Sequence, residues 1–553
     1  MVWEGGERKL TPYPIPANPQ ARLIPCALMT RCSLILIAAA MAAASSHAAA
    51  PPADAELEAL NVAELEAMPA TSTLNSAELT ERYLARIDAL DRHGPHLGAV
   101  LEVDPNAVRA ARQFDQERRA SHVRGTLQGV PILLKDNIDT IGELHTTAGS
   151  FALMDSAPAQ DAFIVRRLRA AGAVILGKTN LSEWANYRSK HASSGWSGRG
   201  GQTRNPYALD RNPCGSSSGS GAAIAADLAL VAVGTETDGS IVCPASVNGL
   251  VGLKPTLGLV SRSGIIPIAA SQDTAGPMTR TVADAAALLN VLAGYDPDDP
   301  ATLPLKDNPP QDFRLALRSD ALKGVRVGVM REFAGFQDDV DRHFEQALNT
   351  LRSLGAVIVD PVSIPTKGKF DTDEQTVLQY EFKDGINRYL AARRGAGPKD
   401  LAALIAFNET HRAQEMSWFG QDILLDAQRA GPLSDSAYID AHERAKRLAG
   451  PEGIDAALSA NHLDVLVAPT LGPAWLTDLI DGDHVVGGDI TSPPAVAGYP
   501  HITVPMEPVH GLPVGLSFVG TAWSDAALLG YAYAFEQATH FRRPPRFLPH
   551  LSE

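Results

Sequence analysis

Residues 161–178 read DAFIVRRLRAAGAVILGK, a stretch in which a helix pattern passes directly into a strand pattern. Residues 161–172 suit an amphipathic helix with Asp161 as its cap, and the apolar run at 173–178 suits a strand that ends on a lysine. A similar run that also ends on lysine, GVPILLK at 129–135, precedes them. Strands that alternate with helices in this way predict an α/β fold.

The same alternation continues on both sides of this stretch. Residues 221–230 (GAAIAADLAL) predict a helix and 231–236 (VAVGTE) a strand, and two further strands are expected at 463–469 and 501–506. The region 301–460 reads mainly as amphipathic helices, which would form either a lid or a cover for the sheet. We find no internal repeat and expect one large domain rather than two.

The N-terminus has the composition of a targeting segment. Residues 29–48, MTRCSLILIAAAMAAASSHA, combine a cationic start, an apolar run and small residues, as a secretory signal peptide does. We expect cleavage after Ala48 and a mature domain at 49–548. Residues 1–28 are rich in proline, so we expect translation to begin at Met29; a long n-region or a disordered tail is the alternative.

Composition and charge exclude several classes of partner. The chain has 48 Lys and Arg against 63 Asp and Glu, a formal charge of −15, and no basic stripe, so nucleic acid is a poor partner. After the leader no segment has eighteen consecutive apolar residues, so we expect a soluble, exported protein, periplasmic or secreted, without stable membrane insertion. No H-E-x-x-H, paired C-x-x-C or phosphate-binding glycine motif occurs, so no metal or cofactor is expected.

The segment CGSSSGSG, residues 214–221, concentrates serine and glycine. It contains a G-x-S-x-G match, but the preceding TRNPYALDRNPC does not suit the strand that a nucleophile elbow requires. Its shortness and the apolar helix after it favour a close backbone approach, although the composition alone also permits a flexible linker. Cys214 could form a disulfide with Cys243, the other cysteine left after processing, but spacing does not decide this.

A second small turn, TDGS at 237–240, follows the strand at 231–236. Such a turn can aim successive N–H groups at an oxyanion, but ordinary turns have the same composition. A serine nucleophile also needs a base. Lys135, Lys178 and Lys254 each end an apolar run, and burial can leave a lysine amine neutral. Each of them could equally be a snorkelling or ion-paired lysine, and periodicity does not rank the three.

Several longer motifs, in order along roughly residues 55–540, resemble the amidase signature family. They are LQGVPILLKDNIDT (127–140), TTAGS (146–150), AGAVILGKTNLSEWA (171–185), the run from Gly215 to Gly276, AGYPHITVPM (497–506) and GLPVGLSFVG (511–520). Together they are far more specific than any one motif. The resemblance implies a single large α/β domain with a central mixed β-sheet covered by helices on both faces.

The resemblance also implies a Ser-cisSer-Lys triad. Ser240 matches the acyl-forming nucleophile, Ser216 the serine that relays its proton across a cis peptide bond, and Lys135 the base. A neutral Lys135 would accept a proton from Ser216 while Ser216 accepts one from the attacking Ser240, and the reverse path would protonate the departing amine. The backbone N–H groups of the expected oxyanion hole are those of Thr237, Asp238, Gly239 and Ser240.

The chain departs from the common family pattern around this turn. Glu236, Asp238, Val242 and Leu259 stand where common members have Asp, Gly and two Arg. These changes argue for a pocket unlike that of the glutamine-hydrolysing transamidation subunit. The variant CGSSSGSG…GTETDGSIVCPA looks most like the peptide amidase branch, whose members remove ammonia from C-terminally amidated peptides without cutting internal peptide bonds.

Three functions compete. We favour a stand-alone amidase that acts on peptide amides or, as the alternative within that class, on small aliphatic or aryl amides. A remote alternative is the glutaminase-type subunit of a tRNA-dependent amidotransferase. It is disfavoured because that complex assembles in the cytosol, whereas the leader indicates export. A catalytically dead binding protein is disfavoured because all three triad positions are filled.

Overall fold

The computed structural model describes residues 55–69, 72, 74–487 and 490–551. The expected signal peptide at 29–48 and the segment 1–28 lie outside the described residues. The domain boundaries 49–548 therefore stay a prediction, and the helices and strands below belong to the described part of the chain.

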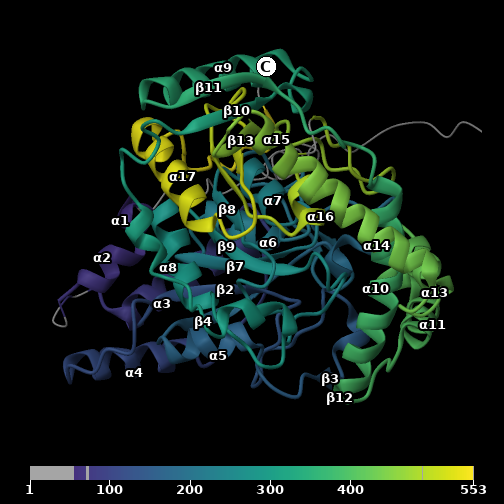
Figure 1. Cartoon of the computed structure of the whole chain (residues 1–553). Coiled ribbons are helices and arrows are strands. Elements are labelled where there is room, and N and C mark those ends of the chain that lie inside the picture. Colours follow the sequence, from purple (N-terminus) through teal and green to yellow (C-terminus); the bar gives the residue numbers. More distant parts are fainter. Residues whose placement is uncertain (1–54, 70–71, 73, 488–489, 552–553) are drawn as a thin grey trace, which may run out of the picture. The chain divides into compact units, whose positions relative to one another are not determined.

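A mixed sheet of eleven strands runs through this part of the chain in the order β1-β4-β2-β7-β9-β8-β14-β15-β13-β10-β11 (Figure 1). Neighbours within β4-β2-β7 and within β13-β10-β11 are parallel, and the other neighbours are antiparallel. The strands are β1 (Val100–Val103), β2 (Pro131–Lys135), β4 (Val174–Thr179), β7 (Val231–Glu236), β8 (Val251–Lys254), β9 (Thr274–Thr279), β10 (Arg326–Met330), β11 (Val357–Val362), β13 (Val465–Pro469), β14 (His501–Pro505) and β15 (Gly515–Val519).

Helices cover both faces of the sheet, with α8 and α17 packed on one face and α6 and α7 on the other (Figure 1). A further layer, α10, α11, α13 and α14, packs outside α16. The helices are α1 (Ala55–Ala59), α2 (Val62–Ala67), α3 (Ser76–Arg86), α4 (Ala107–Arg119), α5 (Phe163–Ala170), α6 (Ser218–Ala225), α7 (Val242–Val247), α8 (Val282–Leu292), α9 (Asp338–Ser353), α10 (Asp371–Ala392), α11 (Leu401–Thr410), α12 (Arg412–Glu415), α13 (Asp422–Arg429), α14 (Ser436–Ala449), α15 (Asp455–Ala460), α16 (Ser492–Ala497) and α17 (Asp525–Thr539). Short two-stranded ladders pair β3 (Ser156–Ala157) with β12 (Arg394–Gly395) and β5 (Trp196–Ser197) with β6 (Gly201–Gln202). The expected single α/β domain with a central mixed sheet is confirmed.

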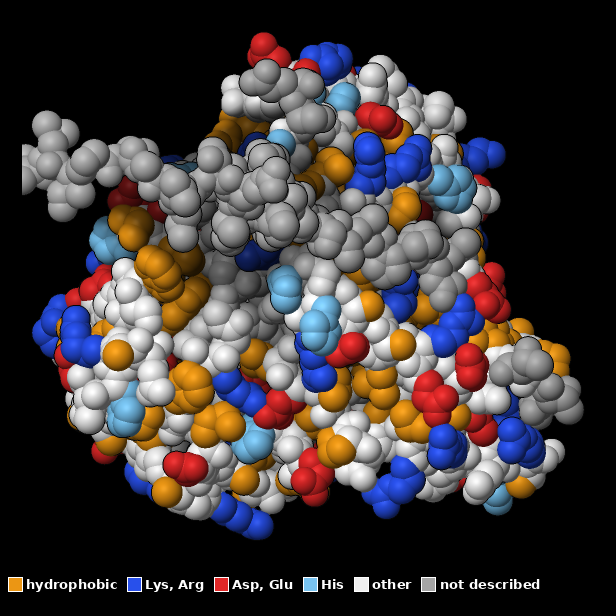
Figure 2. Space-filling view, turned by 180° about the vertical axis from the view of Figure 1, so that it is seen from behind, with side chains coloured by type: hydrophobic (Ala, Val, Ile, Leu, Met, Phe, Trp, Pro, Cys, Tyr) orange, Lys and Arg blue, Asp and Glu red, His pale blue; other side chains and the backbone are white. Residues whose placement is uncertain are grey.

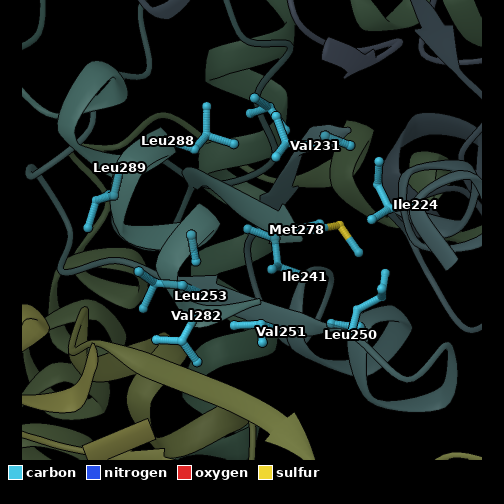
Figure 3. Packing of buried hydrophobic residues seen from close by; sticks show 14 of the residues in the cluster. Ile224, Val231, Ile241, Leu250, Val251, Leu253, Met278, Val282, Leu288 and Leu289 are labelled. Carbon is cyan, nitrogen blue, oxygen red and sulfur yellow. The ribbon is translucent and has the colours of Figure 1, made fainter. Parts of the chain in front are cut away.

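Part of the core lies where strands β7, β8 and β9 meet helix α8 (Figure 3). The side chains labelled there are fully buried: Ile224, Val231, Ile241, Leu250, Val251, Leu253, Met278, Val282, Leu288 and Leu289. Each such side chain contributes about 1.5–3 kcal/mol when it leaves water. Strands β2, β7, β8 and β9 are buried along their whole length because both of their faces are covered, and they form a rigid support for the residues at their ends.

One local prediction is wrong. Helix α5 begins at Phe163 and Ala162 is its N-cap, whereas the Asp161 carboxylate accepts hydrogen bonds from the Ile141 N–H (2.8 Å) and from Arg169 Nε (3.1 Å). The region 301–460 is mainly helical, as expected, but it also contains strands β10 and β11. These strands are short and β11 is largely exposed, so their apolar pattern is weak beside the long helices that flank them.

Candidate active site

The three candidate lysines all lie at one edge of the sheet. Strands β4, β2 and β7 are parallel, and β8 runs in the same direction because both it and β7 are antiparallel to β9. Lys135, Lys178 and Lys254 stand at the carboxyl ends of β2, β4 and β8, respectively. Carboxyl ends of parallel strands are where open α/β sheets place their sites.

Hydrogen bonds distinguish the three lysines, all of which are fully buried. Lys135 Nζ donates to Ser216 Oγ (2.8 Å) and to Thr235 Oγ1 (2.9 Å) at the end of β7. Lys178 Nζ instead donates to the carbonyl of Ile138 and to a threonine hydroxyl, and Lys254 Nζ donates to the carbonyl of Tyr499. Of the three, Lys135 is therefore the one bonded to a serine.

Burial also changes how these lysines titrate. Desolvation lowers the pKa of Lys135 to about 7, although the negative charges of Glu236 and Asp273 act in the opposite direction. The pKa values of Lys178 and Lys254 fall to about 8 for the same reason. A neutral Lys135 amine is thus available near neutral pH.

The three consecutive serines have different partners. Ser216 is fully buried, its peptide bond with Gly215 is cis, and its hydroxyl accepts the bond from Lys135. The Ser217 hydroxyl donates to the carbonyl of Thr235 (3.0 Å), and the Ser218 hydroxyl donates to a carbonyl within its own loop (2.6 Å). Only the first of the three contacts the lysine among these hydrogen bonds, in agreement with the role that the resemblance gave to Ser216.

The strand-turn-helix arrangement of a nucleophile elbow occurs at Ser240 rather than in the serine cluster. No strand directly precedes Ser217, the central serine of the G-x-S-x-G match, which lies at the start of α6. Ser240, in contrast, lies in the short turn between the end of β7 at Glu236 and the start of α7 at Val242. Its side chain is nearly buried, and its carbonyl accepts the Ser217 N–H (3.1 Å), which joins the two serine segments.

The side chains of Thr237 and Asp238 in the turn 237–240 form hydrogen bonds with residues outside the turn. Thr237 Oγ1 donates to Asp273 Oδ1 (2.6 Å), and Ser492 Oγ donates to Asp238 Oδ2 (2.6 Å). Gly239 has φ +73°, a conformation that favours glycine, and an added Cβ would lie 3.1 Å from the Thr491 hydroxyl. The turn is therefore held in one conformation from both sides.

Two of the family departures, Glu236 and Val242, flank this turn, and a third, Asp238, lies within it. The carboxylate of Glu236 is fully buried and accepts the N–H groups of Ile241 (2.7 Å) and Val242 (3.0 Å). Burial raises its pKa, while the charge of Lys254 and the N–H of Gly239 act in the opposite direction. Val242 and Leu259, which replace two arginines, are buried apolar residues. Lys254 thus supplies the positive charge that faces Glu236.

Two cavities border the turn, of about 270 Å³ on the Thr237 side and about 520 Å³ on the Asp238 side. Between them Gln272 Nε2 bonds the carbonyl of Thr237 (3.4 Å) and Glu374 Oε1 (2.9 Å) of helix α10. The smaller cavity is lined by Asn137, Thr237, Arg262, Ile266, Ile268 and Asp273, among others. The larger is lined by Asp238, Phe333, Phe370, Glu374, Leu378 and Thr491, among others. The helical region 301–460 therefore forms part of the walls of the two cavities that border the turn.

Sequence reasoning missed Thr235, Asn137 and Asp273. Thr235 bonds both Lys135 Nζ and Asn137 Nδ2 (2.9 Å each), and Asp273 fixes Thr237. The one available signal was position, because Thr235 and Asn137 stand near the carboxyl ends of neighbouring parallel strands. No spacing in the sequence links Asp273 to the turn that it binds.

Cys214 and Cys243 form a disulfide with their Cα atoms 6.0 Å apart. Their spacing in the sequence did not decide whether they pair. Cys214 lies two residues before Ser216, and Cys243 lies three residues after Ser240. The bridge therefore crosses between the two serine segments of the site.

On the face shown in Figure 2, acidic and basic side chains are intermixed and form no continuous basic stripe among the described residues. In the described part of the chain, none of the helices combines the length and the hydropathy that a membrane span needs.

Comparison with known proteins identifies the family. The amidase family profile matches residues 78–529. A probable amidase of Arabidopsis thaliana is 41% identical over 484 residues, 86% of this chain and 89% of that protein. The solved peptide amidase of Stenotrophomonas maltophilia is 53% identical with a TM-score of 0.84, covering 88% of this chain and 99% of its own. One glutamyl-tRNA(Gln) amidotransferase subunit, from Roseiflexus castenholzii, is 36% identical over 494 residues, 88% of this chain and 97% of that protein. The chain belongs to the amidase signature family and is an amide-hydrolysing enzyme.

Proposed function

We propose that this enzyme hydrolyses the carboxamide of C-terminally amidated peptides and releases ammonia, through an acyl-enzyme on Ser240. The observation that carries this proposal is the Lys135–Ser216 hydrogen bond of 2.8 Å beside the turn that holds Ser240. The 53% identity to the Stenotrophomonas peptide amidase over nearly all of that structure supports the peptide-amide substrate. Small aliphatic or aryl amides are the alternative substrates.

Proton transfer follows the order of the three side chains. As Ser240 Oγ attacks the amide carbonyl carbon, its proton passes to Ser216 Oγ, and the Ser216 proton passes to the neutral Lys135 amine. Collapse of the tetrahedral intermediate breaks the C–N bond, and the protons return along the same path to the leaving nitrogen. Water then attacks the acyl ester, releases the acid and restores the Ser240 hydroxyl.

The developing oxyanion is stabilised by N–H groups of residues 237–240, which we propose as the oxyanion hole. The bonds from Thr237 to Asp273 and from Ser492 to Asp238 support this role, because they hold the turn before substrate arrives. A pocket that is closed on the leaving-group side would accept NH₂ but not a further residue, and so would restrict the enzyme to terminal carboxamides.

Ammonia release from a panel of substrates tests this function. The purified enzyme is offered a C-terminally amidated dipeptide, the matching free-acid dipeptide, benzamide, acetamide and glutamine. We expect ammonia from the amidated dipeptide and no cleavage of its internal bond, as measured by chromatography. Turnover of benzamide or acetamide alone would support the small-amide alternative, and turnover of glutamine alone would support the glutaminase alternative.

The pH dependence of the reaction tests Lys135 as the base. Below a pKa of about 7 the amine is protonated and cannot accept a proton, so kcat/KM is expected to rise tenfold per pH unit up to about pH 7 and then level off. The measurement is kcat/KM between pH 5 and 9.5, with thermal unfolding followed over the same range as the control. A rise in kcat/KM that continues to the top of this range, pH 9.5, would mean that Lys135 keeps the pKa of an ordinary lysine.

We also propose that the mature enzyme is exported and begins at Ala49. The leader composition and the Cys214–Cys243 disulfide support this, because disulfides persist mainly in oxidising compartments. N-terminal sequencing of the protein recovered from the periplasm or medium tests it. Recovery in the cytosol with an intact leader would contradict it.

A further inference from the structure

The two proposed catalytic serines lie in two separate segments, which helix α6 and strand β7 separate along the chain. Ser216 lies in the loop that leads into α6, and Ser240 lies in the turn between β7 and α7. The proposed relay requires these two hydroxyls to come within hydrogen-bond reach of each other during turnover. Their relative position therefore depends on the bonds that connect the loop to the turn and to α7.

Two hydrogen bonds and the disulfide connect the two segments, and residues further along the first segment bond residues earlier in the second. At one end the Pro213 carbonyl accepts a hydrogen bond from Asn248 Nδ2 (3.0 Å). At the other end the Ser240 carbonyl accepts the Ser217 N–H (3.1 Å). The disulfide between residues 214 and 243 lies between these two hydrogen bonds in this order and is the covalent link of the three.

The loop around Cys214 has an unusual backbone. Cys214 has φ +56°, in the left-handed region that non-glycine residues rarely adopt. Its N–H donates to Asn212 Oδ1 (2.8 Å), and its carbonyl accepts the Ser218 hydroxyl (2.6 Å). A residue in this conformation persists only when its surroundings hold it there. The disulfide adds a covalent restraint at that residue, two positions before Ser216.

The disulfide is packed on its outer side. It belongs to a small apolar cluster with Val247 of α7 and with Leu471 and Trp475 from the segment after β13. Cys214 is 5% and Cys243 is 8% exposed, so bulk water does not surround the bridge. The apolar cluster therefore shields the bridge from solvent.

We propose that the Cys214–Cys243 disulfide is a positioning element for amide hydrolysis, which holds the Ser216 loop against the Ser240 turn so that full activity requires the oxidised pair. The inference rests on the proposed function, because the roles of the two serines belong to it. The bridge itself takes no part in the chemistry. It acts on the rate by limiting how far the two hydroxyls separate.

Loss of the bridge is expected to lower kcat by about 5- to 50-fold and to change KM less than twofold. A misplacement of about 1 Å costs on the order of 10²-fold in rate, and the two flanking hydrogen bonds remain, so the loss is smaller than that. Dithiothreitol delivers two electrons and two protons to the bridge, which becomes two thiols while the reductant becomes a cyclic disulfide. Reoxidation should restore the rate.

The experiment compares the full-length wild type with the Cys214→Ser/Cys243→Ser variant, which retains Cys26 and Cys32. Both are assayed before and after dithiothreitol treatment and after reoxidation, at a temperature far below their unfolding midpoints. We expect the reduced wild type to match the untreated variant, and the variant to be insensitive to the reductant. Reduction of the folded wild type keeps the test valid even where the double variant folds poorly.

Two results would overturn the proposal. One is an unchanged kcat in both the variant and the reduced wild type with only a lower unfolding temperature, which means that the bridge merely stabilises the fold. The other is an equal effect of dithiothreitol on the variant, which locates the sensitive group elsewhere. All rates are measured on whichever amide the oxidised enzyme hydrolyses fastest. A different substrate class would therefore change the proposed function, but it would not change the ratio of kcat between the oxidised and the reduced enzyme.

Discussion

Replacing Ser240 with alanine is expected to lower kcat for amide hydrolysis by at least about 10³-fold, because the acyl-enzyme cannot form without the hydroxyl. The buried turn that holds Ser240 depends on Glu236, Asp273 and Ser492 and not on the serine hydroxyl itself, so the variant should fold. KM should change little. Ammonia release and thermal unfolding are measured on the same preparation.

Ser246→Ala is the matched control for this variant. Ser246 lies in α7, six residues after Ser240, and is also buried. Within the described residues its hydroxyl has no hydrogen-bond partner, so its removal should cost little stability and no activity. Retention of more than a tenth of wild-type kcat in Ser240→Ala would contradict the acyl-enzyme. It would instead favour another nucleophile or a binding role.

Replacing Lys135 with methionine should lower kcat by about 10²- to 10⁴-fold, the range that a positioned acid-base group contributes. Methionine has a similar length and fits a fully buried site, while it removes the only lysine amine that bonds Ser216 among the described hydrogen bonds. The pH dependence centred near pH 7 should disappear with it. The measurements are kcat and kcat/KM between pH 5 and 9.5.

Lys178→Met separates the effect of the base from the effect of removing any buried charge. Lys178 is also fully buried, on the neighbouring strand β4, but donates to Ile138 and Thr146 rather than to a serine. Its removal should lower stability, since Asp136 loses a facing charge, and leave kcat of the folded protein within a few-fold. If both lysine variants lost the same activity per folded molecule, Lys135 would not be the specific base.

Much of the fold followed from local patterns in the sequence. The runs at 129–135, 173–178 and 231–236 became the three parallel strands β2, β4 and β7, because strands buried on both faces are apolar along their length. The edge strand β11 was missed because it is largely exposed and lacks that pattern, and β10 was missed because it is only five residues long with Gly328 at its centre. The prediction that Asp161 caps helix α5 was wrong because its carboxylate accepts hydrogen bonds from Ile141 and Arg169 instead.

The sequence by itself determined the fold class and the family resemblance, since ordered motifs and apolar periodicity are local properties, and through that resemblance it predicted Lys135, Ser216 and Ser240 as the triad. Only the tertiary structure decided which of three equally buried lysines meets a serine, that Cys214 reaches Cys243, and that Asp273 holds the turn. These are contacts between segments distant along the chain. Their geometry arises from strand order and register, and no spacing within one segment encodes them.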